Sequence, residues 1–444
     1  MKEIKLTEQE KGVFNLIKKY SITLPEKPIP RAAGGWVRDK LLNKESHDID
    51  IALDNISGYD FAVGLSIFLN KSISDLGVVK SNPDKSKHLE TAILKINDFF
   101  IDFVALRTEE YSDTRIPIIS LGTPEEDALR RDLTINSLFY NLFTEKIEDY
   151  TGKGLEDLQN KIIRTPIDPL QTFYDDPLRI LRTFRFACRF NFIIHKSIYK
   201  ALEDNQIKEY LKTKVSNERI GVEIKKIIEY DSAADVFSDF VKYNLVESIF
   251  KPEINEKIDK IYSLNYEILN YEPKKNLKNL YLILIFYSNK IIKRKKEEFV
   301  NKLICKESLK YPNKFCEEID RIEKGINILL SQEIFPTKMN LIRLVRKIGQ
   351  EWKDSFYFAV LILKINNKSF EKLVSLFNSI LSLKYETFFD IKIPFNGDDI
   401  VKKFNPEKNK ISYFIEEGTI YKIKNPEADK EEIFLFLNEI NKKY

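Results

Sequence analysis

The chain has 444 residues, of which 43% are hydrophobic and 32% are charged, with a formal net charge of +4. This length is enough for several domains, and the apolar content excludes wholesale disorder. The near balance of charges neither indicates nor excludes a nucleic-acid partner, because a local basic stripe matters more than the total charge.

The cysteines and the apolar runs bear on the compartment. Cys188, Cys305 and Cys316 show no paired spacing, which argues against a zinc ribbon and a disulfide framework and fits a reducing environment. The first twenty residues lack the apolar stretch of a signal peptide, and no apolar run approaches the length of a membrane span. We therefore expect an intracellular protein without a membrane partner, placed in the cytoplasm, with the nucleus and mitochondria left open.

Strand and helix signals alternate along the first 150 residues. Short helices are expected over 36–42 and 59–69. The strand candidates are HDIDIAL (47–53), LETAILKI (89–96), FFIDFVAL (99–106) and LTINSLFYNL (133–142). The second and third are predicted to form a hairpin that turns at Asn97-Asp98. This mixture predicts a small domain in which helices pack on a sheet.

Beyond about residue 155 glycine becomes rare and the apolar residues recur with the period of a helix. DDPLRILRTFRFACRF (175–190) and ERIGVEIKKIIEY (218–230) show this period clearly. The rest of the chain, to residue 444, reads as almost entirely helical.

Two carboxylates stand two residues apart in the first strand candidate. Asp48 and Asp50 point to the same face of a strand. Side by side they repel, and at neutral pH such a pair usually needs a cation. Mg²⁺ suits it, because this ion takes one or two carboxylates together with substrate phosphates. Taken alone, this spacing is more often a solvated strand end.

Asp102, in the strand candidate 99–106, is a third candidate acid. Three acids on adjacent strands could hold two metal ions and activate an attacking hydroxyl. A carboxylate on the solvent face of a hairpin explains Asp102 equally well.

The residues before the acid pair favour a catalytic role for Asp48 and Asp50 over a solvated strand end. Gly34 and Gly35 allow the backbone to approach a ligand closely, and amide groups at the start of the following helix can bind phosphates. Arg38, one helical turn further, can neutralise phosphate charge. Glycines, an arginine and a strand with paired acids together indicate phosphoryl transfer.

A second block, RRDLTIN, holds two arginines beside polar side chains. Arg130 and Arg131 precede Asp132 and Asn136. An arginine fork suits phosphate or ribose, and an asparagine can bond a sugar hydroxyl. Without the other blocks, an ordinary charged surface would be the better explanation.

The third block, DDPLRILRTFRF, places arginines along one helix face. Asp176 is expected to cap this helix, with Pro177 as its first residue. Arg179 shares a face with Asp176, and Arg182 and Arg185 follow at the same interval. The opposite positions are expected to lie in the core: Leu178, Leu181, Phe184 and Phe186.

A carboxylate beside a guanidinium can read a base. The carboxylate accepts from the amino group of cytosine or adenine, and the guanidinium donates to the adjacent ring nitrogen. Uracil and guanine present the reverse order and would be rejected. Asp176 and Arg179 could therefore select C and A, although a D-x-x-R pair seen alone is more often an ion pair on a helix surface.

These blocks, in this order, resemble the class II CCA-adding tRNA nucleotidyltransferases, which share a head domain with bacterial poly(A) polymerases. GGWVRD with DID is similar to the catalytic motif, RRDLTIN to the ribose-selecting motif and DDPLRILRTFRF to the nucleotide-template motif. In the last, Asp175 stands where the family usually has glutamate. ERIGVEIKKII resembles a helix thought to support the template helix. The resemblance is specific over about 30–228 and is closest to the eukaryotic branch.

The resemblance implies an α+β protein. The expected parts are a nucleotidyltransferase head with a small mixed sheet (1–155), then an all-helical neck (156–230), body (231–335) and tail (336–444). The implied reaction adds C, C and A to the 3′ end of tRNA from CTP and ATP without a nucleic-acid template. The tail is expected to bind the tRNA elbow, and the Lys-rich run 290–306 could contact phosphates.

The implied site has Mg²⁺ on Asp48 and Asp50, with Asp102 as a further catalytic acid. The residues expected to bind the nucleotide are Gly34, Gly35, Arg38, Arg131, Asp132, Asn136, Asp176, Arg179, Arg182 and Arg185. The segment 107–127 matches the position of a flexible loop that the family ties to the switch from C to A addition. Its presence favours complete CCA addition.

Four alternatives remain at this point. The first two are a poly(A) polymerase of the same superfamily and an enzyme that adds only CC. The third, from another class, is an inactive tRNA-binding protein, which would have no need of the acid pair. The fourth is an HD-type phosphohydrolase, suggested by His47-Asp48 but lacking the further ordered histidines that such a metal site needs.

Overall fold

In the computed structural model the chain forms two compact units, residues 1–251 and 252–444, which are described separately. The described residues are 3–46, 48–72, 76–79, 91–110, 118–250, 290–293, 296–331, 337–382, 391 and 393–442. His47 and His88, which bear on the phosphohydrolase alternative, lie outside them. Among the described residues, no helix combines the length and the apolar character needed to cross a membrane.

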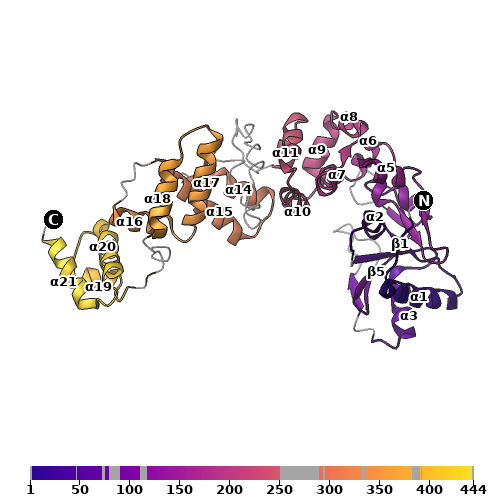
Figure 1. Ribbon diagram of the computed structural model, residues 1–444, viewed down its shortest axis with the longest axis horizontal. Helices are drawn as coiled ribbons and strands as arrows, with labels where there is room; N and C mark the ends of the chain where they lie inside the picture. Colours follow the sequence, from indigo (N-terminus) through magenta and orange to yellow (C-terminus); the bar gives the residue numbers. More distant parts are fainter. Residues whose placement is uncertain are drawn as a thin grey trace. The chain divides into compact units, whose positions relative to one another are not determined.

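A seven-stranded mixed sheet forms the centre of the first unit, in the order β3-β4-β5-β2-β1-β8-β9 (Figure 1). The strands are β1 Arg31–Ala33, β2 Asp48–Leu53, β3 Leu76–Val79, β4 Thr91–Ile96, β5 Phe99–Ala105, β8 Phe139–Asn141 and β9 Lys146–Glu148. β2 and β5 run parallel, and the other neighbours are antiparallel. The predicted β4–β5 hairpin is confirmed, and its turn residue Asn97 has a φ of 53°, which asparagine tolerates well.

Helices α1 (Glu8–Thr23), α2 (Gly35–Leu41) and α3 (Gly58–Phe68) flank this sheet. A capping box of Thr7 and Glu10 starts α1. The buried Glu10 also accepts from the Trp36 indole of α2 at 3.2 Å, so one side chain begins one helix and fixes the next. α3 places Phe61 against Phe103 of β5, with ring centroids 5.3 Å apart.

The prediction of a strand over 133–142 is wrong for its first half. Thr134–Asn136 forms a 3₁₀ turn, and the strand begins only at Phe139. The amide N–H of Thr134 donates to the Arg164 carbonyl at 2.8 Å, and the Thr134 hydroxyl donates to Asp157 at 2.7 Å. These bonds satisfy the polar groups locally, so extended pairing is not required here.

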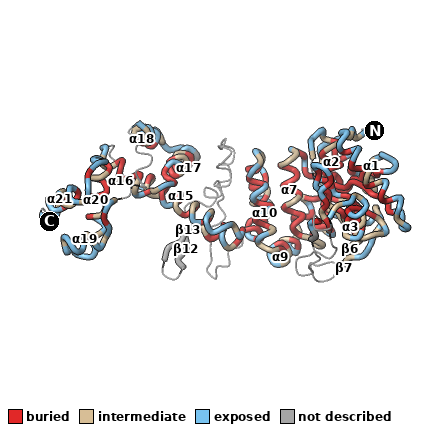
Figure 2. The backbone as a smooth tube through the Cα atoms, turned by 90° about the horizontal axis from the view of Figure 1, so that it is seen from below, coloured by how far each residue is buried: buried red, intermediate tan, exposed pale blue. Residues whose placement is uncertain are grey.

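The chain then forms a set of short helices that complete the first unit. They are α4 Pro124–Leu129, α5 Gly154–Asn160, α6 Pro169–Asp175, α7 Leu178–Phe190, α8 Lys196–Ala201, α9 Asn205–Lys214, α10 Asn217–Ile228, α11 Ala233–Lys242 and α12 Val246–Ile249. Figure 2 shows buried residues along α7 and α10. The contact between α7 and α10 that the family resemblance implies is present.

Two small sheets stand beside the central one in the described part of this unit, and only the first lies where helices alone were predicted. β10 (Ile162–Ile163) pairs in parallel with β11 (Ile193–Ile194). β6 (Arg107–Glu110) and β7 (Ile118–Leu121) pair within the segment that matches the family's flexible loop, and residues 111–117 between them lie outside the described part.

The described part of the second unit is mainly helical, as predicted, with one exception. Its helices are α14 Val300–Leu303, α15 Asn313–Ser331, α16 Lys338–Ile348, α17 Trp352–Ile365, α18 Glu371–Ser382, α19 Gly397–Phe404, α20 Ile411–Lys424 and α21 Lys430–Asn441. The expectation of a helix through the Lys-rich run is wrong, because Lys290–Lys293 and Lys296–Phe299 pair as antiparallel strands β12 and β13. The β-branched pair Ile291-Ile292 favours extended backbone. The division into head, neck, body and tail stays a prediction.

We expect Gly58→Ala to destabilise the first unit. A Cβ at this position would lie 2.1 Å from the Phe103 carbonyl oxygen, which belongs to the backbone of a central strand. Overpacking of this kind costs about 1–3 kcal/mol. Gly12→Ala in α1 is the matched control, because no atom lies within 4 Å of its added Cβ. Thermal unfolding should show a lower melting temperature for the first variant and an equal or higher one for the second.

Candidate active site

Three carboxylates share one face of the sheet at its centre. Asp48 and Asp50 belong to β2, where burial alternates so that Ile49 and Ile51 face the core. Asp102 of β5 is the direct neighbour of Asp50 in the parallel register. The predicted acid pair and the third acid are therefore adjacent, which the sequence spacing alone could not establish for Asp102.

The crowding of these carboxylates perturbs their ionisation. Burial raises the pKa of Asp102 to about 6, and the charges of Asp50 and Asp48 add to that rise. Burial also raises the pKa of Asp50, with Arg131 opposing the shift and Asp48 adding to it. Neighbouring carboxylates with raised pKa values suit a cation, because a bound cation would remove the repulsion between the ionised carboxylates.

The chain bends sharply where β1 leads into α2. Gly34 has a φ of 62°, in the region that favours glycine. A Cβ there would lie 2.7 Å from the Arg131 guanidinium, so the glycine also lets this arginine approach the backbone. The Gly34 N–H donates to the Leu138 carbonyl at 2.9 Å. Any phosphate contact from this bend would therefore come from later amides.

Arg38 is buried and fixed on every side. Its guanidinium donates to the Asn136 side-chain oxygen and, at 2.8 Å, to Asp39. The rings of Phe186 and Phe190 lie 5.1 and 4.7 Å from it. Burial lowers the pKa of Arg38, and Asp39 counteracts this. The Arg38 side chain therefore lines the site, and its guanidinium is held pointing toward Asn136.

Asp132 joins the RRDLTIN turn to helix α7. Its carboxylate accepts from the Asn136 amide at 2.9 Å and from Arg182 at 2.7 Å. Burial by itself would raise the pKa of Asp132, but Arg182 and the Asn136 amide outweigh it and lower the pKa to about 2. The loop that carries Asp132 is thus held to α7 by a buried, charge-assisted contact.

Asp127, within α4, was not singled out from the sequence. Its two carboxylate oxygens accept separately from Arg130 and, at 2.7 and 2.9 Å, from Arg131. Arg131 also donates to the Asn136 carbonyl at 3.0 Å and lies over the Phe139 ring at 4.9 Å. A carboxylate three and four residues before two arginines is a helical signal that could have identified it.

Helix α7 presents its arginines differently from the prediction. Its first helical residue is Leu178, one later than expected, although Asp176 still accepts from the Leu178 N–H at 3.2 Å. The Asp176 carboxylate pairs with Arg219 of α10 at 2.7 Å. Arg179 donates instead to the Arg130 carbonyl at 2.7 Å. The two residues expected to read a base together therefore have separate partners.

Arg185 differs from expectation, whereas Phe186 is buried as predicted. Arg185 forms a buried ion pair with Glu223 of α10 and does not line the pocket. Phe186, expected in the core, lines the pocket and has the guanidinium of Arg182 at 5.5 Å and of Arg185 at 4.1 Å from its ring centroid. The face of the Phe186 ring attracts the nearby guanidinium groups and so stabilises cations that lie close together. Through the Arg185–Glu223 ion pair, α10 supports α7.

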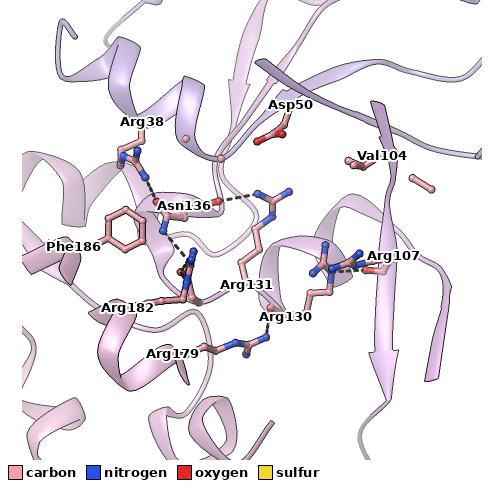
Figure 3. Close-up of a pocket in the computed structure, with 14 residues that line it drawn as sticks. Arg38, Asp50, Val104, Arg107, Arg130, Arg131, Asn136, Arg179, Arg182 and Phe186 are labelled. Atoms are coloured by element: carbon pink, nitrogen blue, oxygen red, sulfur yellow. Dashed lines mark hydrogen bonds and ion pairs between the residues drawn. The ribbon is translucent and has the colours of Figure 1, made fainter. Parts of the chain in front are cut away.

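A pocket of about 440 Å³ collects most of these groups (Figure 3). Its lining includes the predicted residues Gly34, Gly35, Arg38, Asp50, Arg131, Asp132, Asn136, Arg179 and Arg182. Arg107, Arg130, Val104, Ala105 and Phe186 also line it and were not predicted as site residues. Asp48, Asp102, Asp176 and Arg185 lie outside the lining. Two acids, Asp50 and Asp132, stand among several guanidinium groups, which suits a polyphosphate whose charge the arginines balance.

The donor set fits a Mg²⁺ ion better than a metal held by protein alone. Within the described ranges, no group of three or more His, Cys, Asp or Glu side chains is arranged to hold a metal ion. Mg²⁺ needs fewer protein ligands, because it retains waters and shares substrate phosphates. Asp48 and Asp50, beside the arginine-lined pocket, offer such a partial set.

Family models match two parts of the chain. Residues 31–164 match the poly A polymerase head domain, which covers the sheet and the RRDLTIN turn. Residues 191–258 match a family described as a probable RNA and SrmB-binding site of polymerase A.

Relatives match along nearly the whole length. The chain is 35% identical to tRNA nucleotidyltransferase cca1 of Schizosaccharomyces pombe over 98% of this chain and 97% of that protein. It is 33% identical to cca2 of the same organism, over 98% and 99%. A mitochondrial CCA tRNA nucleotidyltransferase of Candida glabrata is 50% identical over 51% of this chain and 45% of its own length.

A solved structure shares the fold. The crystal structure of the Bacillus stearothermophilus CCA-adding enzyme in complex with CTP aligns with a TM-score of 0.67 at 19% identity, covering 99% of both chains.

We expect Asp132→Asn to lower stability at neutral pH and to lose this effect in acid. The folded-state pKa of about 2 lies below the ordinary value of 3.8, so the ionised carboxylate contributes stability above pH 4 that is lost as the pH falls toward 2. The shift corresponds to about 2 kcal/mol. Melting temperatures of the wild type and of Asp132→Asn, measured from pH 7 downward, should begin to approach each other below pH 4 and should meet near pH 2.

Asp98→Asn, in the exposed β4–β5 turn, is the control and should match the wild type throughout. A difference for Asp132→Asn that stays constant with pH would contradict the proposed ion-pair contribution.

Proposed function

The chain belongs to the tRNA nucleotidyltransferase family, as a class II CCA-adding enzyme of the eukaryotic type, and we propose how its residues divide the work. It adds C, C and A to the 3′ end of tRNA from CTP and ATP, without a nucleic-acid template. In each step the tRNA 3′ oxygen forms a bond to the α-phosphorus of the nucleotide and pyrophosphate leaves. The observation that carries the assignment of roles is the pocket that joins Asp50 to the arginines of the head and of α7.

We assign the divalent metal ion to Asp48 and Asp50, with Mg²⁺ as the ion. Their position on one strand face and the raised pKa of Asp50 and Asp102 support this assignment. When bound, the ion would stabilise negative charge on the triphosphate and favour ionisation of the attacking hydroxyl. Asp102, beside Asp50 in the register, is proposed as the further acid that takes part in holding or releasing that proton.

The nucleotide is proposed to lie with its phosphates against the head. Arg131 faces Asp50 across the pocket (Figure 3) and can neutralise triphosphate charge. Gly34 and Gly35 leave room for the chain of phosphates, while Arg38 acts mainly by orienting Asn136. Asn136 and Asp132 are the groups proposed to meet the ribose.

Base selection is proposed to belong to Asp176 and Arg179 at the start of α7. Arg179 lines the pocket and Arg182 lies one turn further along the same wall. Arg219 holds the Asp176 carboxylate, and Glu223 holds Arg185, so α10 fixes both ends of this surface. In this proposal Asp176 accepts from the exocyclic amine of C or A and Arg179 donates to the ring nitrogen.

The rest of the chain is proposed to bind the body of the tRNA, with the tail gripping the elbow. We place the enzyme in the cytoplasm, with mitochondria and the nucleus as further sites. The names of two relatives, from Candida glabrata and Saccharomyces cerevisiae, include the word mitochondrial.

The first test uses a tRNA transcript that ends at the base before CCA, with Mg²⁺ and CTP alone, ATP alone, or both. Two added residues with CTP and a terminating third with both nucleotides are expected. A long ladder from ATP alone would instead indicate a poly(A) polymerase, and two residues without a third would indicate a CC-adding enzyme.

In the same assay Asp48→Ala should abolish incorporation while gel shifts show tRNA binding retained. The reason is that the carboxylate pair is proposed to act on the reacting groups and not on the tRNA body. Asp98→Ala removes a nearby exposed acid and should behave as the wild type. Normal turnover by Asp48→Ala would refute the metal assignment.

Arg179→Ala should relax base choice by about tenfold or more, since a paired base contact contributes about 1–3 kcal/mol of discrimination. Misincorporation of UTP and GTP relative to CTP, measured as ratios of kcat/KM, provides the test. Arg189→Ala, which removes a guanidinium from the same helix outside the pocket lining, is the control. Unchanged rejection of UTP and GTP by Arg179→Ala would remove this residue from base selection.

A further inference from the structure

One aromatic side chain on the catalytic face of the sheet is exposed without belonging to the pocket. Phe100 of β5 is 55% exposed, although its strand neighbours Phe99 and Ile101 are buried. The alternation of β5 places Phe100 on the same face as Asp102. A large exposed ring next to a catalytic acid has no role in packing the core.

The register shows what surrounds this ring. Phe100 lies between Asp48 of β2 on one side and Lys95 of β4 on the other. The Lys95 ammonium is 5.5 Å from the ring centroid. An aromatic face, a lysine and a metal-binding carboxylate therefore form one row across three strands.

The chemistry defines which substrate comes from this side. In phosphoryl transfer the attacking and leaving oxygens lie roughly in line with phosphorus. The pocket that would hold the nucleotide reaches Asp50, Val104 and Ala105, and its lining includes neither Asp48 nor Phe100. The hydroxyl that attacks must then approach the acids from the side opposite to the arginines. The row Lys95–Phe100–Asp48 extends the acid pair on a side that the pocket does not line.

We propose that Phe100 and Lys95 bind the 3′-terminal nucleotide of the tRNA, with the base stacked on the Phe100 ring and a neighbouring phosphate at Lys95. This inference rests on the proposed function. Stacking on an aromatic ring tolerates any base, which suits an enzyme that must accept different terminal nucleotides. The contact positions the 3′ hydroxyl beside Asp48 without reading sequence.

Phe100→Ala should raise the KM for tRNA by about tenfold, because stacking contributes about 1–3 kcal/mol per base. The KM for CTP should stay unchanged. Phe100→Trp should restore the wild-type value, whereas Phe100→Leu, apolar but not aromatic, should not. Phe143→Ala, which removes another exposed phenylalanine from the head, is the matched control. Lys95→Ala should lower the salt dependence of the KM for tRNA, since one phosphate contact is lost.

A tRNA whose terminal nucleotide lacks its base separates stacking from a structural effect. The wild type should show the same rise in KM with this abasic tRNA as Phe100→Ala shows with the intact one. Combining the variant with the abasic tRNA should add no further loss. Additive losses, an unchanged KM for Phe100→Ala, or a shift confined to CTP would each overturn the proposal. Failure of the wild type to extend intact tRNA would instead refute the proposed function itself.

Discussion

The buried carboxylate of Asp132 holds the active site together. It accepts from Arg182 of α7 and from Asn136, whose side-chain oxygen in turn accepts from Arg38 of α2. Guanidinium groups crowded around one pocket repel each other, and low solvent access would make that repulsion costly without a buried negative charge. Because these contacts connect the RRDLTIN turn and α2 to α7, the wall proposed to bind phosphate and the wall proposed to meet the base share one network.

The same principle recurs around the pocket. Asp127 separates Arg130 from Arg131, and Glu223 of α10 pairs with Arg185. Each carboxylate pairs with arginines and thereby fixes the direction of their guanidinium groups. Within the described part of the chain, the three acids of β2 and β5 lack such partners, and burial, with the charges of the neighbouring acids adding to it, raises the pKa of Asp50 and of Asp102. The proposed site is thus divided into a positive region, assigned to the phosphates, and a negative region, assigned to the metal ion.

Much of this architecture was accessible from sequence because its signals are local. The period-two alternation of DIDIAL placed Asp48 and Asp50 on one face, and the asparagine turn at Asn97 joined β4 to β5. The arginine interval along 178–190 predicted a helix, and the structure contains it. Two predictions were wrong. At Thr134–Asn136 local polar hydrogen bonds form a turn where the apolar pattern predicted a strand. At 290–299 strand pairing replaces the helix that the apolar pattern predicted.

The sequence by itself determined the chemical groups, the strand face of the acid pair and the helix that carries Arg179 and Arg182, since these depend on spacings within one element. Only the tertiary structure decided which groups meet. It set Asp102 beside Asp50, removed Asp176 and Arg185 from the pocket lining by pairing them with α10, and placed Phe100 between Lys95 and Asp48. These pairs join residues that are far apart in the sequence. Strand order and helix packing bring them together, and no local sequence pattern encodes either.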